Sequence, residues 1–439
     1  SIGPTTSERL RDRQLPVDLE ASKGKIGVFV QDMAAQAATL LKRKQNLTAV
    51  VAQRTPTAAK SNADGSTIDA PTVSVATRRQ QLVQATINEP WHDARFLRAC
   101  RGQAVDATPV WLMRQAGRYM PEYRAVRAKT SFLELCKNPQ LCSEVMCTAV
   151  DFLGVDAAII FSDLLPILEP MGLDLEFAPG DGPVIHNPVR EAADVDRVVD
   201  LDSVDALHFV VETVKHTRAD IDDKIPVIGF AGAPFTLASY TIEGGSSRNY
   251  LHTKTLMYRD EGAWAALMRR LSRAVTLYLN AQIAAGAQAV QLFDSWVGCL
   301  GPADYARYVQ PYVRELIAGI TPAAPVIHFG TGNPELLPLM AEAGGDVIGV
   351  DWRIELRDAW RRIGHHHAVQ GNLEPLALLA DLEELRRRAA DVLDQAEGRP
   401  GHIFNLGHGI LPQTPPESAR ALVDMVHELS AECGMRNAE

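Results

Sequence analysis

The chain has 439 residues, of which 46% are hydrophobic and 22% are charged. These proportions are ordinary for a soluble globular protein, and the length suits two or three average domains or one large barrel with appendages. The formal net charge of −10 disfavours a nucleic acid as partner, because such proteins need a strongly basic face. No run approaches the roughly 18 uncharged apolar residues of a membrane-spanning helix, so we expect no membrane partner.

Residues 1–90 differ in composition from the rest of the chain. We expect a short helix from Asp32 to Lys44, and then a linker or disordered segment over residues 54–78, which contain almost no large apolar side chain. Residues 33–63 carry five basic and no acidic side chains, which is also typical of an organelle transit peptide. We therefore divide the chain into an N-terminal extension, part helical and part linker (1–90), and a folded domain (91–439).

Beyond residue 105, short apolar runs alternate with longer segments of helical periodicity, among them 262–286, 303–320 and 376–396. Eight of the runs have the length and composition of strands buried on both faces. They are Pro109–Met113, Ala157–Phe161, Val227–Gly232, Ala289–Ser295, Pro325–Gly330, Val347–Trp352, Ala368–Asn372 and Ile403–His408. This pattern predicts an α/β fold, a (β/α)8 TIM barrel. A doubly wound sheet is the alternative, but residues 114–118 lack the glycine spacing of its nucleotide loop.

In a TIM barrel the active site lies at the carboxyl ends of the strands. Polar side chains gather at these positions: Arg114, Arg118, Arg124, Arg127, Ser162, Asp163, Tyr240, Asp294, Ser295, His328, Asp351, Arg353, Gln370, Asn372, Asn405 and His408.

Four arginines within 14 residues, opposed only by Glu122, form a local cationic patch on an acidic protein. The guanidinium group has paired donors that fit a carboxylate or a phosphate. A solvated helix face is the alternative interpretation of such a run. Because Arg114 and Arg118 follow a predicted buried strand directly, we favour an anion site.

Asp163 follows the second apolar run almost directly. Its carboxylate could accept N–H bonds from a substrate and stabilise positive charge, or could instead anchor a neighbouring loop amide. Tyr240 and Ser295 are weaker candidates, since tyrosine near a strand end is often a core residue and Ser295 lacks the glycines of a nucleophile elbow. His408 lies between two glycines, where the backbone can approach a ligand closely.

The sequence lacks several motifs that bind metals and cofactors. It contains no His-x-x-x-His pair, no carboxylate-rich magnesium cluster and no P-loop, so we expect no metal and no cofactor. The six cysteines are sparse and form no Cys-x-x-Cys pair, which indicates buried, reduced thiols. Together with the lack of a secretory signal, this composition indicates a cytoplasmic protein.

Residues 109–124 resemble the N-terminal signature of the uroporphyrinogen decarboxylase family. Five later blocks are similar to that family's other motifs and occur in the same order: 161–163, 232–236, 243–246, 370–373 and 405–409. The resemblance covers residues 92–435, which is nearly all of the predicted barrel, and leaves out residues 1–90.

The resemblance implies a homodimeric carboxy-lyase of porphyrin and heme biosynthesis. Members of that family convert the four acetate side chains of uroporphyrinogen III to methyl groups, giving coproporphyrinogen III and CO2 without a metal or organic cofactor. By this pattern Asp163 would accept N–H bonds from the pyrroles and stabilise a cationic ring, and Arg114 would position the leaving carboxylate. Further substrate contacts would come from Gln115, Ala116, Gly117, Arg118, Arg127, Tyr240, Ser295 and His408.

Two alternatives remain open at this point. Corrinoid-dependent methyltransferases share the barrel and carry zinc on a His-x-Cys motif, but Gly330 stands where that cysteine would follow His328. A tetrapyrrole-binding protein without catalytic activity would bind the same ring and leave its carboxyl groups in place.

Overall fold

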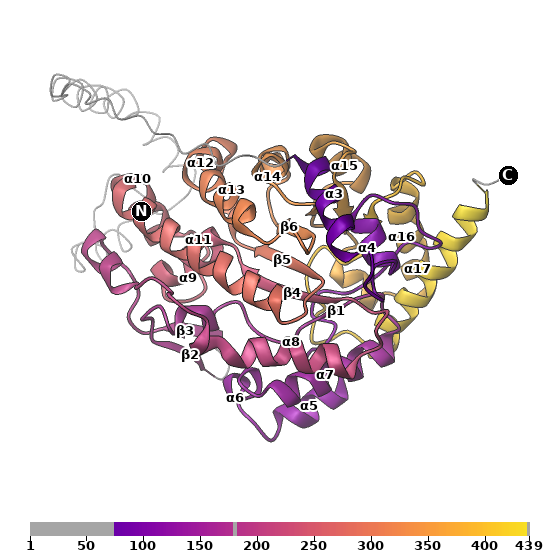
Figure 1. Ribbon diagram of the computed structural model, residues 1–439, viewed down its shortest axis with the longest axis horizontal. Helices are drawn as coiled ribbons and strands as arrows, with labels where there is room; N and C mark the ends of the chain where they lie inside the picture. Colours follow the sequence, from indigo (N-terminus) through magenta and orange to yellow (C-terminus); the bar gives the residue numbers. More distant parts are fainter. Residues whose placement is uncertain (1–73, 179–181, 437–439) are drawn as a thin grey trace, which may run out of the picture. The chain divides into compact units, whose positions relative to one another are not determined.

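A computed structural model of the chain describes residues 74–178 and 182–436 (Figure 1). The helix expected from Asp32 to Lys44 lies outside these residues. Asp69–Glu439 forms one unit by its internal contacts, and the description below concerns this unit. Within the described residues, no helix combines the length and apolar character needed to cross a membrane.

A seven-stranded parallel sheet forms the centre of the described unit, in the order β1-β4-β5-β6-β7-β8-β9. Figure 1 labels β1, β4, β5 and β6 of this sheet. Almost every strand residue is buried, as expected for strands covered on both faces. The strands are β1 (Ala158–Ile159), β4 (Val227–Gly232), β5 (Ala289–Asp294), β6 (Val326–Gly330), β7 (Val347–Gly349), β8 (Ala368–Gln370) and β9 (His402–Ile403). Each matches one of the predicted apolar runs.

The first predicted strand, Pro109–Met113, is not a strand in the structure. It forms only an isolated parallel bridge between Val110 and Phe404. The Phe404 amide donates to the Pro109 carbonyl at 2.8 Å, and the Asp156 amide donates to the Val110 carbonyl at 2.8 Å. By these hydrogen bonds the segment lies between the chain after β9 and the chain before β1. It therefore stands where the eighth strand of a TIM barrel would lie. The prediction of eight full strands is wrong in this detail, whereas the TIM-barrel-like fold is confirmed.

Helices surround the sheet (Figure 1). The main ones are α7 (Pro139–Leu153), α8 (His208–Asp220), α9 (Pro234–Glu243), α10 (Leu251–Arg259), α11 (Glu261–Ala284), α12 (Pro302–Tyr308), α13 (Gln310–Gly319), α14 (Leu337–Ala343), α15 (Leu356–Ile363), α16 (Leu382–Gln395) and α17 (Pro416–Arg436). The helix predicted over 262–286 is α11. The segment 303–320 is divided at Val309 into α12 and α13, because Pro311 has no amide hydrogen to continue the helix. In the segment 376–396, α16 begins only after Asp381, whose side chain accepts the Glu384 amide at 2.8 Å.

An antiparallel hairpin, β2 (Leu175–Ala178) and β3 (Gly182–Ile185), was not predicted from the sequence. The Ile185 amide donates to the Gly244 carbonyl at 2.8 Å, which joins the hairpin to the C-terminal end of α9. Phe177, Gly182 and Pro183 of the hairpin line a cavity together with Asp163 and His408, so the hairpin lies at the carboxyl ends of the strands.

Helix α3 (Val75–Thr86) begins within the segment that we expected to be a linker, so that expectation is wrong for residues 75–78. Arg78 of α3 is buried, and its Nε donates to Oδ2 of the fully buried Asp346 at 2.9 Å. Its Nη2 donates to the Ala324 carbonyl at 3.2 Å. Asp346 and Ala324 precede β7 and β6, so α3 packs against the amino ends of the strands, the bottom of the barrel. A division of the chain at residue 90 leaves this helix outside the domain on which it packs.

Candidate active site

A cavity of ≈ 720 Å³ opens at the carboxyl ends of the strands, the mouth of the barrel. It brings together nine of the ten residues predicted from the sequence as site residues, from positions far apart in the chain. These are Arg114, Ala116, Gly117, Arg118, Arg127, Asp163, Tyr240, Ser295 and His408.

Gln115 is the predicted site residue that does not line the cavity. Its side chain is fully buried, and its Nε2 donates to the Ala157 carbonyl at 3.2 Å. The Tyr119 hydroxyl donates to the Gln115 carbonyl at 2.7 Å. Gln115 therefore fixes the loop that carries Arg114 and Arg118 to the chain entering β1.

Arg124, the fourth arginine of the sequence patch, also lies outside the cavity lining. Its guanidinium donates to the carbonyls of Arg118 and Tyr119 at 3.0 and 2.7 Å. It supports the same loop from outside, in agreement with its place in the sequence patch but not among the predicted site residues.

The other three, Arg114, Arg118 and Arg127, are called the mouth arginines below. Ion pairs in the described part of the chain involve arginines such as Arg78 and Arg353, and none of them includes a mouth arginine. Burial, followed by the like charge of Arg118, lowers the pKa of Arg114, while Asp163 opposes that shift. The cavity thus holds positive charge that forms no ion pair with a carboxylate of the described residues.

Asp163 lies in the cavity wall directly after β1. Its Oδ1 accepts the Leu165 amide at 3.0 Å, which fixes the rotation of the carboxylate. Burial raises the pKa of Asp163, while the amide bond and the Arg114 guanidinium oppose this rise. Two roles were considered for Asp163 from the sequence, an anchor for a loop amide and a carboxylate of the site. The structure shows the bond to the loop amide and also places the carboxylate in the cavity wall.

His408 and Tyr240 present neutral polar groups to the cavity. Burial and the nearby Arg114 lower the pKa of His408 to about 4, so its ring is neutral at pH 7. Its Nδ1 accepts the Gly409 amide at 2.7 Å, which assigns the ring proton to Nε2. Tyr240 stacks on Trp296 with ring centroids 3.8 Å apart, and burial raises its pKa. Both side chains are therefore hydrogen-bond donors at neutral pH.

Aromatic residues that the sequence analysis did not single out form the apolar walls of the cavity. They include Phe132, Phe161, Phe177, Phe230 and Phe293. Phe132 contacts Phe161 and Phe177 edge-on, with centroids 6.3 and 4.9 Å apart. Phe230 and Phe293 belong to β4 and β5, where alternation along a predicted strand is the available signal, and it does not say which face points into the barrel.

Several other polar residues at strand ends do not line this cavity, contrary to the sequence interpretation. His328 is buried against α14, with its Nδ1 3.3 Å from the Met340 carbonyl. The Gln370 side chain is buried, accepting the Trp111 indole N–H at 3.0 Å. Asp294, Asn372 and Asn405 are buried as well. These polar side chains are therefore part of the interior of the barrel and do not face the cavity.

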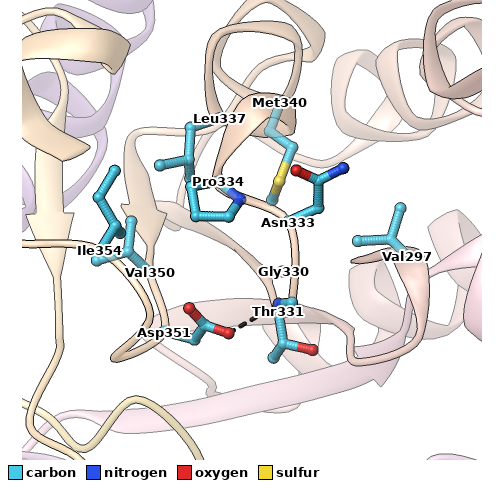
Figure 2. A pocket seen from close by; sticks show the side chains of 11 residues that line it. Val297, Gly330, Thr331, Asn333, Pro334, Leu337, Met340, Val350, Asp351 and Ile354 are labelled. Atoms are coloured by element: carbon cyan, nitrogen blue, oxygen red, sulfur yellow. Dashed lines mark hydrogen bonds between the residues drawn. The ribbon is translucent and has the colours of Figure 1, made fainter. Parts of the chain in front are cut away.

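Asp351 lines a second, much smaller hollow beyond β6 and β7, and Arg353 lies outside the lining of both cavities. Figure 2 shows the Asp351 carboxylate beside Thr331, with apolar side chains such as Val350 and Ile354 nearby. Asp351 Oδ2 accepts the Gly332 amide at 2.7 Å, and the carboxylate pairs with Arg353. The partners of this carboxylate therefore come from the loop after β6 and from its own loop after β7.

Within residues 74–178 and 182–436, no cluster of three or more His, Cys, Asp or Glu side chains could hold a metal ion. Gly330 stands where the zinc-binding cysteine of corrinoid-dependent methyltransferases would follow His328. A Cβ at this position would lie 2.7 Å from the Met340 Cε, so Met340 would have to move to admit any side chain there. Cys100, Cys136 and Cys142 are buried free thiols, as predicted, whereas Cys147 and Cys299 are half-buried.

The fold and this cavity define a TIM-barrel protein with a cationic, aromatic-walled site at the carboxyl ends of its strands. Residues 92–429 match the family described as Uroporphyrinogen decarboxylase (URO-D). A uroporphyrinogen decarboxylase from Roseiflexus sp. (strain RS-1) is 54% identical over 345 residues, 77% of this chain and 99% of that relative. One from Sorangium cellulosum (strain So ce56) is 54% identical over 339 residues, 77% of this chain and 97% of that relative. The chain belongs to the uroporphyrinogen decarboxylase family, as the sequence motifs predicted.

A solved structure of a methyltransferase from Methanosarcina mazei shares the fold. It matches with a TM-score of 0.65 at 21% identity and covers 76% of this chain and 97% of its own. At that identity the likeness concerns the fold alone.

Proposed function

We propose that this protein is a carboxy-lyase that converts uroporphyrinogen III to coproporphyrinogen III and CO2 in porphyrin and heme biosynthesis. The reaction removes the carboxyl group from each of the four acetate side chains. Membership of the uroporphyrinogen decarboxylase family supports the reaction, and the chemistry of the cavity supports the substrate.

The substrate is a flexible ring of four pyrroles that carries eight carboxylates. Carboxylates of the bound ring would supply the counter-charge that the mouth arginines lack, and paired guanidinium donors suit them geometrically. The apolar Phe walls would contact the pyrrole faces and exclude water, which strengthens each of these ion pairs. Ala116 and Gly117 would line the cleft with backbone, and Tyr240, Ser295 and His408 would donate hydrogen bonds to the substrate's oxygens.

Decarboxylation needs an acceptor for the electron pair of the breaking carbon–carbon bond. A pyrrole that has been protonated on carbon is such an acceptor, and it lies within the substrate itself, so the proposed chemistry uses no metal or organic cofactor. The acetate's carbon–carbon bond breaks, CO2 leaves, and the electron pair neutralises the cationic ring. A proton is then added to the freed methylene carbon to complete the methyl group, and the ring carbon loses the proton that it first received, which restores the pyrrole. Each cycle therefore consumes one proton net and releases one CO2.

Asp163 would stabilise this cationic ring by accepting pyrrole N–H bonds. Its carboxylate is already oriented by the Leu165 amide, so little reorganisation is needed when positive charge develops. Arg114 would hold the departing carboxylate against the ring, since its guanidinium lies in the same cavity as Asp163. We also propose a homodimer in the cytoplasm, as the family resemblance implies, without a nucleic-acid or membrane partner.

The observation that carries the proposal is that Arg114, Arg118 and Asp163 share one cavity. The test is to incubate the purified, metal-stripped protein with uroporphyrinogen III under anaerobic conditions and to count carboxyl groups in the product by mass spectrometry. We expect a product with four carboxyl groups. Binding of the ring with all eight groups retained would contradict the proposal and support a tetrapyrrole carrier. Turnover that returns only with added zinc would contradict it as well.

A further inference from the structure

Gly409 lies against the side chain of Arg114 in the cavity wall. A Cβ placed on Gly409 would lie 2.4, 2.7 and 2.8 Å from Cδ, Cγ and Nε of Arg114, and these are its three nearest atoms. Such distances are far below van der Waals contact, so the arginine in its present position requires a residue without a side chain at position 409. We propose that Gly409 is a positioning residue for Arg114, a role that rests on the proposed function.

The backbone of Gly409 does not by itself require glycine. Gly409 is not among the glycines with positive φ, whereas Gly371 has φ 141° and would be strained with any side chain. The neighbouring Gly407 is also restricted for a different reason, because its Cβ would meet the Trp352 backbone nitrogen at 2.5 Å. Of these three glycines, Gly409 is limited by a side chain that lines the cavity.

Arg114 itself has an unusual backbone conformation, with φ 64° in the left-handed region. A residue other than glycine adopts this conformation at a cost, and such strain concentrates at functional sites. The Ile410 amide donates to the Met113 carbonyl at 2.9 Å, which brings the segment after β9 beside the arginine. The turn at Arg114 and the bare α-carbon of Gly409 together allow the arginine stem to pass along this segment.

The same glycine also contacts His408. Its amide donates to His408 Nδ1 and leaves the Nε2 proton free, as described above. Gly409 thus orients a charged and a neutral group of the cavity through different atoms. An alanine at 409 would keep the amide and lose only the space for Arg114, so the two roles separate experimentally.

The test is a double-mutant cycle with Gly409→Ala, Arg114→Ala and the combined variant, measuring kcat/KM for uroporphyrinogen and the melting temperature. We expect Gly409→Ala alone to lower kcat/KM by about tenfold or more, because displacement of a catalytic group by about 1 Å is costly. With Arg114 already truncated, we expect the added Gly409→Ala change to cost less than about twofold. Equal losses in both backgrounds would overturn the proposal.

Matched controls separate positioning from damage to the fold. Gly407→Ala should lower the melting temperature equally with and without Arg114, because its obstacle is the Trp352 backbone. Gly301→Ala should change little, since no atom outside the adjacent residues lies within 4 Å of its Cβ position. If Gly409→Ala alone does not fold, the combined variant should fold, and failure of both would overturn the proposal.

A crystal structure of Gly409→Ala provides a readout independent of activity. We expect the Arg114 guanidinium to leave its position in the cavity while the His408–Gly409 contact remains. An unmoved Arg114 would refute the positioning role even if the wild-type protein is an active decarboxylase. An inactive wild-type protein would instead refute the proposed function and leave this structural test valid.

Discussion

Arginines lie at both ends of the barrel, and the two groups differ in what they contact. At the bottom, Arg78 is buried and its guanidinium bonds to the Asp346 carboxylate and the Ala324 carbonyl. At the mouth, Arg114 and Arg118 share a cavity with Asp163 but belong to no ion pair in the described part of the chain. A buried cation with protein partners stabilises the fold, whereas cations left without partners in a cavity are suited to a ligand's negative charge. Substitutions at the two ends should therefore change different measurements.

The largest effect on catalysis is expected at Asp163. Asp163→Asn keeps an oxygen for the Leu165 amide but removes the negative charge, so kcat should fall by about 10²–10³-fold while the melting temperature changes little. Steady-state kinetics and thermal unfolding of the same preparation measure both. Turnover near that of the wild type would remove Asp163 from the mechanism.

At the bottom of the barrel, Arg78→Gln should act on stability alone. It leaves the buried Asp346 carboxylate without its cation, which costs about 3 kcal/mol in the free energy of unfolding. Urea denaturation measures this loss, and kcat/KM should be unchanged under native conditions. As a control, Arg357→Gln breaks the exposed pair with Glu397 and should cost less than about 1 kcal/mol. Equal losses in the two variants would contradict the comparison.

Arg118→Gln is the opposite case at the mouth. Arg118 is exposed and its like charge lowers the pKa of Arg114, so its removal should not lower the melting temperature. We expect kcat/KM to fall by about tenfold, mostly through KM, because one charge-assisted contact with a substrate carboxylate is lost. A lower melting temperature with unchanged KM would assign Arg118 to the fold.

The smallest expected effect is on the free energy of unfolding at acidic pH. Burial lowers the pKa of His408 at the mouth and of His367 at the bottom to about 4, while an unfolded histidine binds its proton near pH 6.5. Between these values the unfolded chain holds the additional protons, so the free energy of unfolding should fall as the pH drops from about 6.5 to about 4. His408→Gln and His367→Gln should each flatten this slope by about one proton, and only His408→Gln should lower kcat/KM. An unchanged slope in both variants would refute the assignment.

Much of the barrel could be predicted because its strands are continuous apolar runs. Strands such as β4 and β5 are buried on both faces, and local sequence suffices to locate them. The segment 109–113 has the same composition, yet its pairing depends on the distant Phe404 and reduces to a single bridge. Helix α3 was missed because the partner of Arg78, Asp346, lies 268 residues away in the chain. A deletion of residues 1–85 would remove most of this helix.

Part of the site could also be predicted, because the strands can be located from local sequence and the residues that follow them are then known. Charged residues directly after strands, such as Asp163 and Arg114, reach the mouth because the strand ends meet there. His328 and Gln370 occupy similar positions in the sequence, but strand alternation directs them elsewhere, and their direction depends on tertiary packing. Phe177 could not be predicted as a wall residue, because the hairpin that carries it is held by the long-range bond between Ile185 and Gly244. The space at Gly409 becomes visible only when Arg114 has coordinates.

A crystal structure with coproporphyrinogen III bound under anaerobic conditions measures the distance from the Asp163 carboxylate to the pyrrole nitrogens. We predict N–O distances of about 2.7–3.2 Å, with propionate groups of the ring on Arg114 and Arg118. A ring seated outside this cavity, or an Asp163 that faces away from every pyrrole nitrogen, would contradict the account.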